Sequence, residues 1–424
     1  MTRSALTIAV LCAALAAGAV MRVIHPGDIE YKDDERYTFG EVQRVLHGGS
    51  LPALGMPMSV GPANPGMSIW IFVALGWITG AETPPQLARA VQAVNVIALG
   101  GLVALACFVI AADRRETWLW AAALWAVNPL AIVLERKIWA QSVLPIFTVA
   151  LVAAWLQRRR PLGSLLAGVL AAVAAQIHMS GGLLAAALVG WTAIGDRRSV
   201  RWLSLGAGAA VASLPALPWI SAVAHTGSAL HRLRWPFGSF YKYWLMRAFG
   251  FGAEFPLGPA DFSRFVRGPV IDGQPAWLLF ALLATMAAIG ALLLVLAAVR
   301  LAGSRWSLRG WVFGSTESGR LVRAVFWGFG GLLTTLTIVG AGLFPHYLEV
   351  AAPVISLWVA SLAAAAGGGV IAGRERRLLA ALCVCNALVA GALLAQIHSA
   401  GGSSGDFGPT WARQQSRAVA GPGK

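Results

Sequence analysis

Long apolar runs recur along this 424-residue chain from one end to the other, and they constrain its fold more than any other feature. The chain is 58% hydrophobic and only 12% charged, about half the charge of a soluble domain. Runs of this length predict an all-α polytopic membrane protein. The twelve runs cover residues 4–24, 67–80, 88–110, 117–134, 138–156, 162–177, 180–195, 202–223, 276–299, 323–343, 347–368 and 377–397.

The run at 67–80 is short for a membrane span and follows a Pro/Gly-rich stretch, GMPMSVGPANPG. If it stays at the interface, about eleven spans remain, and every short arginine cluster falls on the same side as Arg3. The positive-inside rule therefore favours eleven spans with a cytoplasmic N-terminus in the cell membrane. We expect a transmembrane domain over 1–397, outer loops at 25–87 and 224–275, and a flexible extracytoplasmic tail at 398–424.

The first outer loop carries a cluster of carboxylates directly after the first run. They are Asp28, Glu30, Asp33, Asp34, Glu35 and Glu41. Carboxylates are costly to dehydrate, so a cluster at the mouth of a membrane protein predicts a wet and functional site. A solvated turn beside a span is the alternative.

Several other polar residues are expected at the outer ends of spans, on the same face as the acidic loop. They are Arg89, Glu135, Arg136, Lys137, His178, His346 and Glu349. Together with the carboxylates they would suit an anionic substrate such as a lipid-linked phosphate, whose tail can enter between helices. Each also has a simpler interpretation: the cations as residues that reach the headgroups, and the histidines as hydrogen-bonded packing residues.

The second outer loop contains HRLRWPFGSFYKYWLMRAFGFG, in which Arg232, Arg234, Lys242 and Arg247 alternate with aromatic residues. This composition predicts an interfacial helix among lipid headgroups.

Other classes of function find no support in the sequence. The net charge of +15 resides in loop arginines, so it does not indicate nucleic-acid binding. There is no P-loop, GxGxxG, HExxH or CxxC motif, so an ATP-driven pump or zinc protease of known motif type is disfavoured. No cofactor is required by these features, and no metal site is predicted, although the carboxylates and histidines leave a divalent cation open.

The order of these segments resembles the membrane glycosyltransferases of the GT-C superfamily, most closely glycosyltransferase family 39, the protein O-mannosyltransferase and aminoarabinose-transferase group. The resemblance is carried by YKDDERYTFGEVQRVLHGG, NPGMSIWIFVALGWITG, LARAVQAVNVIALGG, ERKIWAQSVLPIF, LLAGVLAAVAAQIHMSGGLL and FPHYLEVAAPVISL. It implies juxtamembrane helices in the first outer loop. It also implies an inverting transfer of a sugar from a polyprenyl-phosphate donor, outside the cytoplasm, to a glycan, lipid or protein acceptor.

The resemblance also implies roles for individual residues. The family's acidic pair maps onto Asp34, as the base, and Glu35, with Asp33 as the alternative in register. Contacts to the donor phosphate fall to Arg136, Lys137, Arg89 and His346, and contacts to the sugar or acceptor to His178, Asn64, Tyr347 and Glu349. Two departures concern Asn64, which stands in NPG where many relatives have a His-Pro-Pro-like turn, and His346, where many relatives have a basic residue.

Two other functions remain open at this stage. A transporter or flippase of lipid-linked saccharides would place charges in mid-span and show paired broken helices. The charges here gather at the outer rim, which favours the enzyme. A non-catalytic assembly protein would tolerate loss of Asp34.

Overall fold

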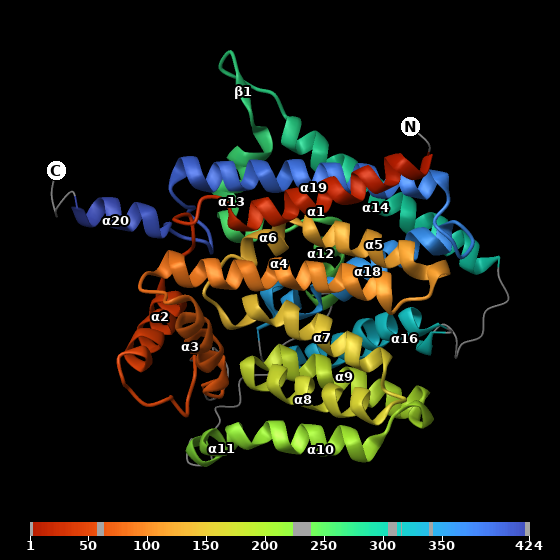
Figure 1. Ribbon diagram of the computed structural model, residues 1–424. Coiled ribbons are helices and arrows are strands. Elements are labelled where there is room, and N and C mark those ends of the chain that lie inside the picture. Colours follow the sequence, from red (N-terminus) through yellow and green to blue (C-terminus); the bar gives the residue numbers. More distant parts are fainter. Residues whose placement is uncertain are drawn as a thin grey trace.

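The structure is a computed structural model, and it describes residues 3–56, 63–223, 239–303, 312–314, 316–338 and 342–419, with side chains from Thr7 onward. Most of these residues are helical, and each of the twelve apolar runs falls mainly on helices over its described residues (Figure 1). Six helical segments in this part of the chain are long and apolar enough to cross a membrane, and further apolar helices are shorter. The predicted all-α polytopic class is therefore confirmed, while the count of eleven spans stays a prediction.

The first layer of the bundle contains the N-terminal and C-terminal long helices, which lie alongside each other in Figure 1. Its members are α1 (Arg3–Val23), α4 (Pro84–Phe108), α5 (Ala112–Ala126), α6 (Pro129–Leu134), α14 (Leu278–Ala302) and α19 (Gly373–Ala400). Gly18 allows α1 to approach α5 closely, because a side chain there would overlap the backbone of Ala126. Small residues of this kind are the usual basis of close helix packing in membranes.

The second layer is built from consecutive helices joined by tight connections. They are η1 (Ala140–Val143), α7 (Leu144–Leu156), α8 (Pro161–Ile177), α9 (Met179–Gly195), η2 (Arg197–Ser199), α10 (Trp202–Ser213), η3 (Leu214–Ala216) and α11 (Leu217–Val223). Proline near the start of α7 and α8 fits the first turn, where no backbone donor is needed. In the segment Trp202–Val223, only 17% of the most apolar 18-residue window is buried. The segment therefore forms an outer edge, and it contacts mainly α8.

The core helix is α18 (Ala352–Ala366), which continues from the 3-10 helix η5 (Pro345–Ala351). In the combined segment Pro345–Ala366, 83% of the most apolar 18-residue window is buried. Around it pack α5, α7, α14 and α19, together with α12 (Ser239–Phe249) and α16 (Glu317–Arg323). The π-helical turn η4 (Ala324–Phe329) and α17 (Gly330–Ile338) extend α16. Aromatic rings of α12, η4 and α18 fill the space between them, including Trp244, Phe326 and Trp358.

The helix α12 comprises part of the second outer loop, and Phe240, Trp244 and Arg247 on it are buried inside the protein. The segment thus packs on the bundle rather than lying only among headgroups as its composition predicts. Arg232 and Arg234 lie outside the described residues. Beyond α12 the chain forms α13 (Glu254–Arg267) and a short antiparallel pair, β1 (Val270–Ile271) with β2 (Gln274–Pro275).

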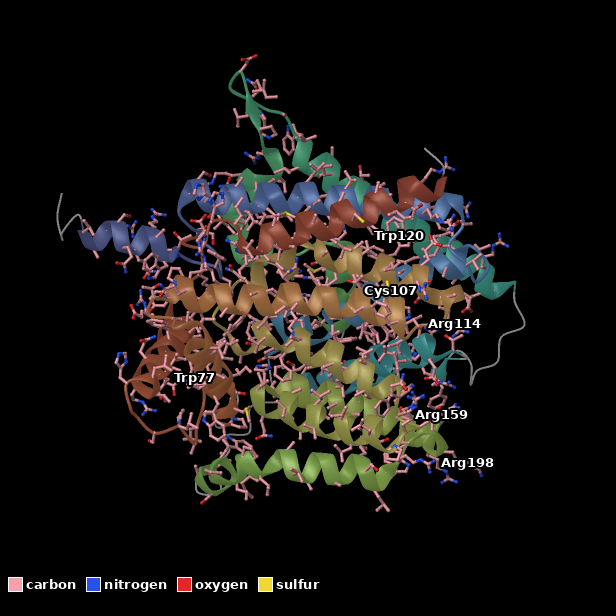
Figure 2. The ribbon with its side chains drawn as sticks, in the orientation of Figure 1. Trp77, Cys107, Arg114, Trp120, Arg159 and Arg198 are labelled. Atoms are coloured by element: carbon pink, nitrogen blue, oxygen red, sulfur yellow. The ribbon has the colours of Figure 1, made fainter. Side chains whose placement is uncertain are left out.

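The two ends of the bundle differ in charge. Arg114, Arg159 and Arg198 gather at one end of the molecule, and Trp77 lies at the opposite end (Figure 2). At the arginine end, Arg158 is buried and forms ion pairs with Asp196 (3.2 Å) and Glu317 (2.8 Å). The Trp77 end carries α2 (Asp33–Leu46), α3 (Met67–Thr79) and α20 (Trp411–Val419), and α3 forms a hairpin with α2 there (Figure 1).

The composition of residues 398–424 predicts a flexible tail, and the structure differs over 398–411. The helix α19 continues to Ala400, and the chain then turns back onto the first outer loop through a bridge between Glu30 and Thr410. Backbone N–H groups of Trp411 and Ala412 donate to the carbonyls of Ile29 and Gly27, each at 3.0 Å. These bonds pair backbone groups of two segments that are far apart in the sequence. The Gly/Ser-rich composition of the second segment does not predict this contact.

Candidate functional site

A cavity of about 290 Å³ opens at the α2 end of the bundle, opposite the arginine clusters. Segments distant in sequence meet around it: the start of α2, the loop before α3, the connection between α6 and α7, the α8–α9 turn, η5, and the segment after α19. Its lining consists of Glu30, Lys32, Asp34, Glu35, Met56, Asn64, Trp139, Gln141, His178, Met179, Phe255, Phe344, His346, Tyr347 and Asp406. The size of the cavity and its mixture of aromatic and charged side chains suit a polar ligand that contains one or a few rings.

The first turn of α2 supplies the acidic side chains of the cavity. Acidic residues are favoured at a helix N-terminus by the exposed N–H groups there. Asp33 points to solvent and is exposed, Asp34 is half-buried and lines the cavity, and Glu35 is buried and also lines it. The backbone N–H of Lys32 donates to Glu35 Oε2 at 3.3 Å, which closes the capping contact at this end of the helix.

Asp34 is oriented by a tryptophan. The indole Nε1–H of Trp139 donates to Asp34 Oδ2 at 2.9 Å. The Trp139 ring also contacts two neighbours: the centre of the His346 ring lies 4.5 Å from its centre, and the Lys137 ammonium 4.6 Å from its centre. A charge-assisted bond to a ring packed in this way fixes the carboxylate in one orientation.

Glu35 lies in a low-dielectric position that favours its neutral form. Burial, together with the nearby carboxylate of Glu30, raises the pKa of Glu35 to about 8. Burial likewise raises the pKa of Glu30 above its usual range, against the pull of Lys137 and Lys32. Asp34 and Glu35 are therefore adjacent in sequence but differ in environment, and Glu35 holds a proton at neutral pH.

Two lysines and two carboxylates form a compact cluster at the edge of the cavity. The Lys32 ammonium lies 2.8 Å from Glu30 and 3.6 Å from Asp406. Lys137 is almost fully buried, forms an ion pair with Glu30, and lies 3.9 Å from Asp406. Lys32 lines the cavity, whereas Lys137 lies behind Glu30, so Lys32 is the cation closer to a ligand.

His178 closes one side of the cavity at the turn between α8 and α9. The backbone N–H of Ser180 donates to His178 Nδ1 at 3.2 Å. The side-chain nitrogen Gln141 Nε2 lies 2.9 Å from His178 Nε2. Burial lowers the pKa of His178 to about 4, so the ring is neutral at physiological pH.

Besides Glu30, whose Oε2 forms an ion pair with Lys137, three lining residues in the described part of the chain carry a buried polar atom without a hydrogen-bond partner. They are Asn64 at Oδ1, Gln141 at Oε1 and His346 at Nδ1. Buried polar atoms are nearly always paired, so unpaired ones on residues that line a cavity favour a site for a ligand rich in hydroxyl groups. Tyr347 also lines the cavity, with its ring 5.6 Å from that of His178.

Arg136 does not line the cavity, contrary to its predicted place among the phosphate ligands. Its guanidinium donates to the carbonyls of Met21 (2.6 Å), in the last turn of α1, and of Ile24 (2.7 Å) and His25 (3.0 Å), just after it. Carbonyls at a helix C-terminus lack intrahelical partners, so Arg136 is used as their cap.

The other predicted residues outside the cavity are Asp33, Arg89, Glu349 and Lys137. Arg89 is exposed on α4. Glu349 is fully buried and accepts a bond from Arg247 at 2.5 Å, so it holds α12 against η5. In the same interior, Arg22 of α1 donates to Glu135 at 2.6 Å.

The sequence gives little signal for Lys32, Trp139, Gln141 and Asp406 as site residues, whereas Glu30 belongs to the predicted carboxylate cluster. Lys32 and Glu30 stand within the acidic loop, and Trp139 and Gln141 follow the predicted Lys137, so proximity in sequence to predicted residues is the available clue. For Asp406 there is none, because it follows the last apolar run. Among the described residues, one group of three potential metal ligands converges, His25, Asp28 and His398, and it lies outside the cavity lining.

No known protein family matches this chain, and no curated protein matches it. Among solved structures, the crystal structure of ArnT from Cupriavidus metallidurans bound to undecaprenyl phosphate is similar, with a TM-score of 0.45 and 15% sequence identity. The match covers 85% of this chain and 59% of that one, so this chain spans less than two thirds of its length. We therefore infer the function of this chain from its own cavity.

Proposed function

We propose that this protein is an inverting glycosyltransferase that moves a sugar from a polyprenyl-phosphate carrier to an acceptor on the extracytoplasmic side of the membrane. The observation that carries the proposal is an oriented carboxylate, Asp34, in a cavity that also holds a lysine and several unpaired polar atoms. The segment order that resembles GT-C glycosyltransferases supports the same assignment. The position of the cavity opposite the arginine clusters favours the extracytoplasmic side.

In this reaction the acceptor hydroxyl lies against the Asp34 carboxylate. As the hydroxyl oxygen forms a bond to C1 of the sugar, Asp34 takes its proton, and the bond from C1 to the phosphate oxygen breaks with its electron pair on the phosphate. The attack and the departure occur on opposite faces of C1, so the configuration is inverted. The products are the glycosylated acceptor and polyprenyl phosphate.

The remaining lining residues have supporting roles in this scheme. The Lys32 ammonium meets the charge that develops on the leaving phosphate. The protonated Glu35 donates a hydrogen bond to the acceptor or to Asp34, which an ionised carboxylate cannot do. Asn64, Gln141 and His346 offer their free atoms to sugar hydroxyl groups. The scheme uses only these side chains and the energy of the sugar–phosphate bond.

The test compares Asp34→Asn with Asp33→Asn, two isosteric changes one residue apart on the same helical turn. Each variant is produced in a strain lacking the gene, at equal membrane abundance, and the cell-envelope glycans and lipid-linked sugars are measured. We expect Asp34→Asn to reduce transfer by about 10²- to 10⁴-fold, the usual contribution of a general base, with accumulation of the sugar-loaded carrier. Asp33→Asn, which changes an exposed side chain, should retain activity.

Full transfer by Asp34→Asn would refute the assignment of the base. A flippase would give a different pattern: the sugar-loaded carrier would fail to reach the outer leaflet in a null strain, and purified protein in vesicles would move it without forming a glycosylated product.

A further inference from the structure

A second cluster of chemically active side chains lies at the same end of the molecule as the cavity but is not used by the proposed transfer. It contains His25, just after α1, Asp28 in the first outer loop, and His398 in the last turn of α19. His398 Nδ1 lies 2.6 Å from Asp28 Oδ2, although the two residues are 370 positions apart in the chain. The His25 and His398 rings stack with their centres 4.1 Å apart.

The chemistry of this cluster is that of a transition-metal site. One ligand atom from each residue lies within 4.8 Å of the other two, so small side-chain rotations bring all three onto one ion. Two imidazole nitrogens and one carboxylate oxygen are a donor set that Zn²⁺ binds in proteins, with water in the fourth position.

The backbone around the cluster is already fixed in place. The His25 carbonyl accepts a hydrogen bond from Arg136 at 3.0 Å, and the backbone of His25 is in the left-handed region with φ of 51°. Histidine is among the few residues other than glycine that adopt this conformation with some frequency. Because the site is partly exposed, an ion and its water can reach it from solvent.

We propose that His25, Asp28 and His398 form a binding site for a divalent zinc ion that joins the first outer loop to the end of α19. The two chain segments that meet at this site also contact each other beyond it. Residues 27–30 pair with residues 410–412 through backbone hydrogen bonds, and the same two segments then place Glu30 and Asp406 on the cavity lining. A bound ion would thus tie down the segment that closes one side of the cavity, whatever reaction takes place there.

The experiment measures zinc directly on the full-length protein, purified with an affinity tag that contains no histidine. The protein is stripped with a chelator, reloaded with ZnCl₂, passed through a desalting column, and analysed for metal by mass spectrometry. Variants are His25→Ala, His398→Ala and Asp28→Asn, and the matched control is His47→Ala, which removes an exposed histidine outside the cluster. Thermal unfolding with and without zinc provides a second readout.

We expect one zinc per chain in the wild type and in His47→Ala, and at least tenfold weaker binding in each cluster variant. Zinc should raise the unfolding temperature of the wild type and of His47→Ala alone. Asp28→Asn keeps the size and the hydrogen bond to His398, so it serves where a histidine variant does not fold. The proposal is overturned if the reloaded wild type holds no stoichiometric zinc, or if the cluster variants hold as much as the control.

Discussion

Glu35 is a buried carboxyl whose proton makes the stability of the protein depend on pH. Burial raises its pKa to about 8 in the folded protein, against 4.5 for the free side chain. Its stabilising contribution is therefore complete below pH 4.5 and is lost as the pH rises toward 8, because the unfolded chain gives up the proton first. With about 1.4 kcal/mol for each pKa unit, the cost to folding at pH 7 is about 3 kcal/mol.

The change Glu35→Gln isolates this effect. The amide cannot ionise, and its oxygen can still accept the Lys32 backbone N–H that now donates to the carboxyl at 3.3 Å. We expect the free energy of unfolding of Glu35→Gln to equal that of the wild type near pH 4.5 and to exceed it by about 3 kcal/mol at pH 7. Glu30 adds pH dependence of the same sign to both proteins, so it cancels in the comparison.

The assay is denaturant unfolding in detergent micelles at several pH values, followed by tryptophan fluorescence. Glu41→Gln is the matched control, since Glu41 is on the same helix but pairs with Arg44 at the surface. If Glu35→Gln destabilises the protein equally at pH 5 and pH 8, the carboxyl is ionised when folded and our account of its environment is wrong.

Two further changes test how the site is built. Trp139→Phe removes the donor to Asp34 but keeps an aromatic ring; a hydrogen bond to a charged group contributes about 1.5–3 kcal/mol, so we expect transfer to fall roughly 10- to 100-fold, measured as initial rate with saturating donor. Arg136→Met leaves the carbonyls at the end of α1 without their donor, so we expect the unfolding temperature to fall while the KM for the donor is unchanged. For Lys32→Met we expect the reverse: an increased KM for the donor and an unchanged unfolding temperature. An increased KM in Arg136→Met would assign Arg136 to the phosphate site after all.

Much of the architecture follows from the sequence because the membrane restricts the choices. An apolar run of sufficient length has to be helical in lipid, and every run identified is mainly helical over its described residues. Short connections then bring neighbouring runs together, and the arginines identify one end of the bundle. The acidic first turn of α2 can also be predicted, since acidic residues such as Asp34 and Glu35 are favoured near a helix N-terminus.

The individual roles of the charged residues cannot be predicted from the sequence in this way. Arg136 and Lys137 are adjacent and both positively charged, yet one caps α1 and the other pairs with Glu30. That difference depends on where α1 ends relative to the connection after α6, which is a matter of tertiary packing. The contribution of Asp406 depends on a return of the chain after α19 that its Gly/Ser-rich sequence does not predict.

The pairing of Lys32 with Asp406 also has a consequence for how the protein is made. The two residues are 374 positions apart in the chain, so one wall of the cavity emerges from the ribosome long after the other. At typical rates of synthesis the delay is on the order of 20 to 75 s. During that time the cavity lacks the lining that the chain after α19 supplies, so it is complete only once that segment has been synthesised and packed. A partly synthesised chain therefore has no finished cavity in which to bind a ligand.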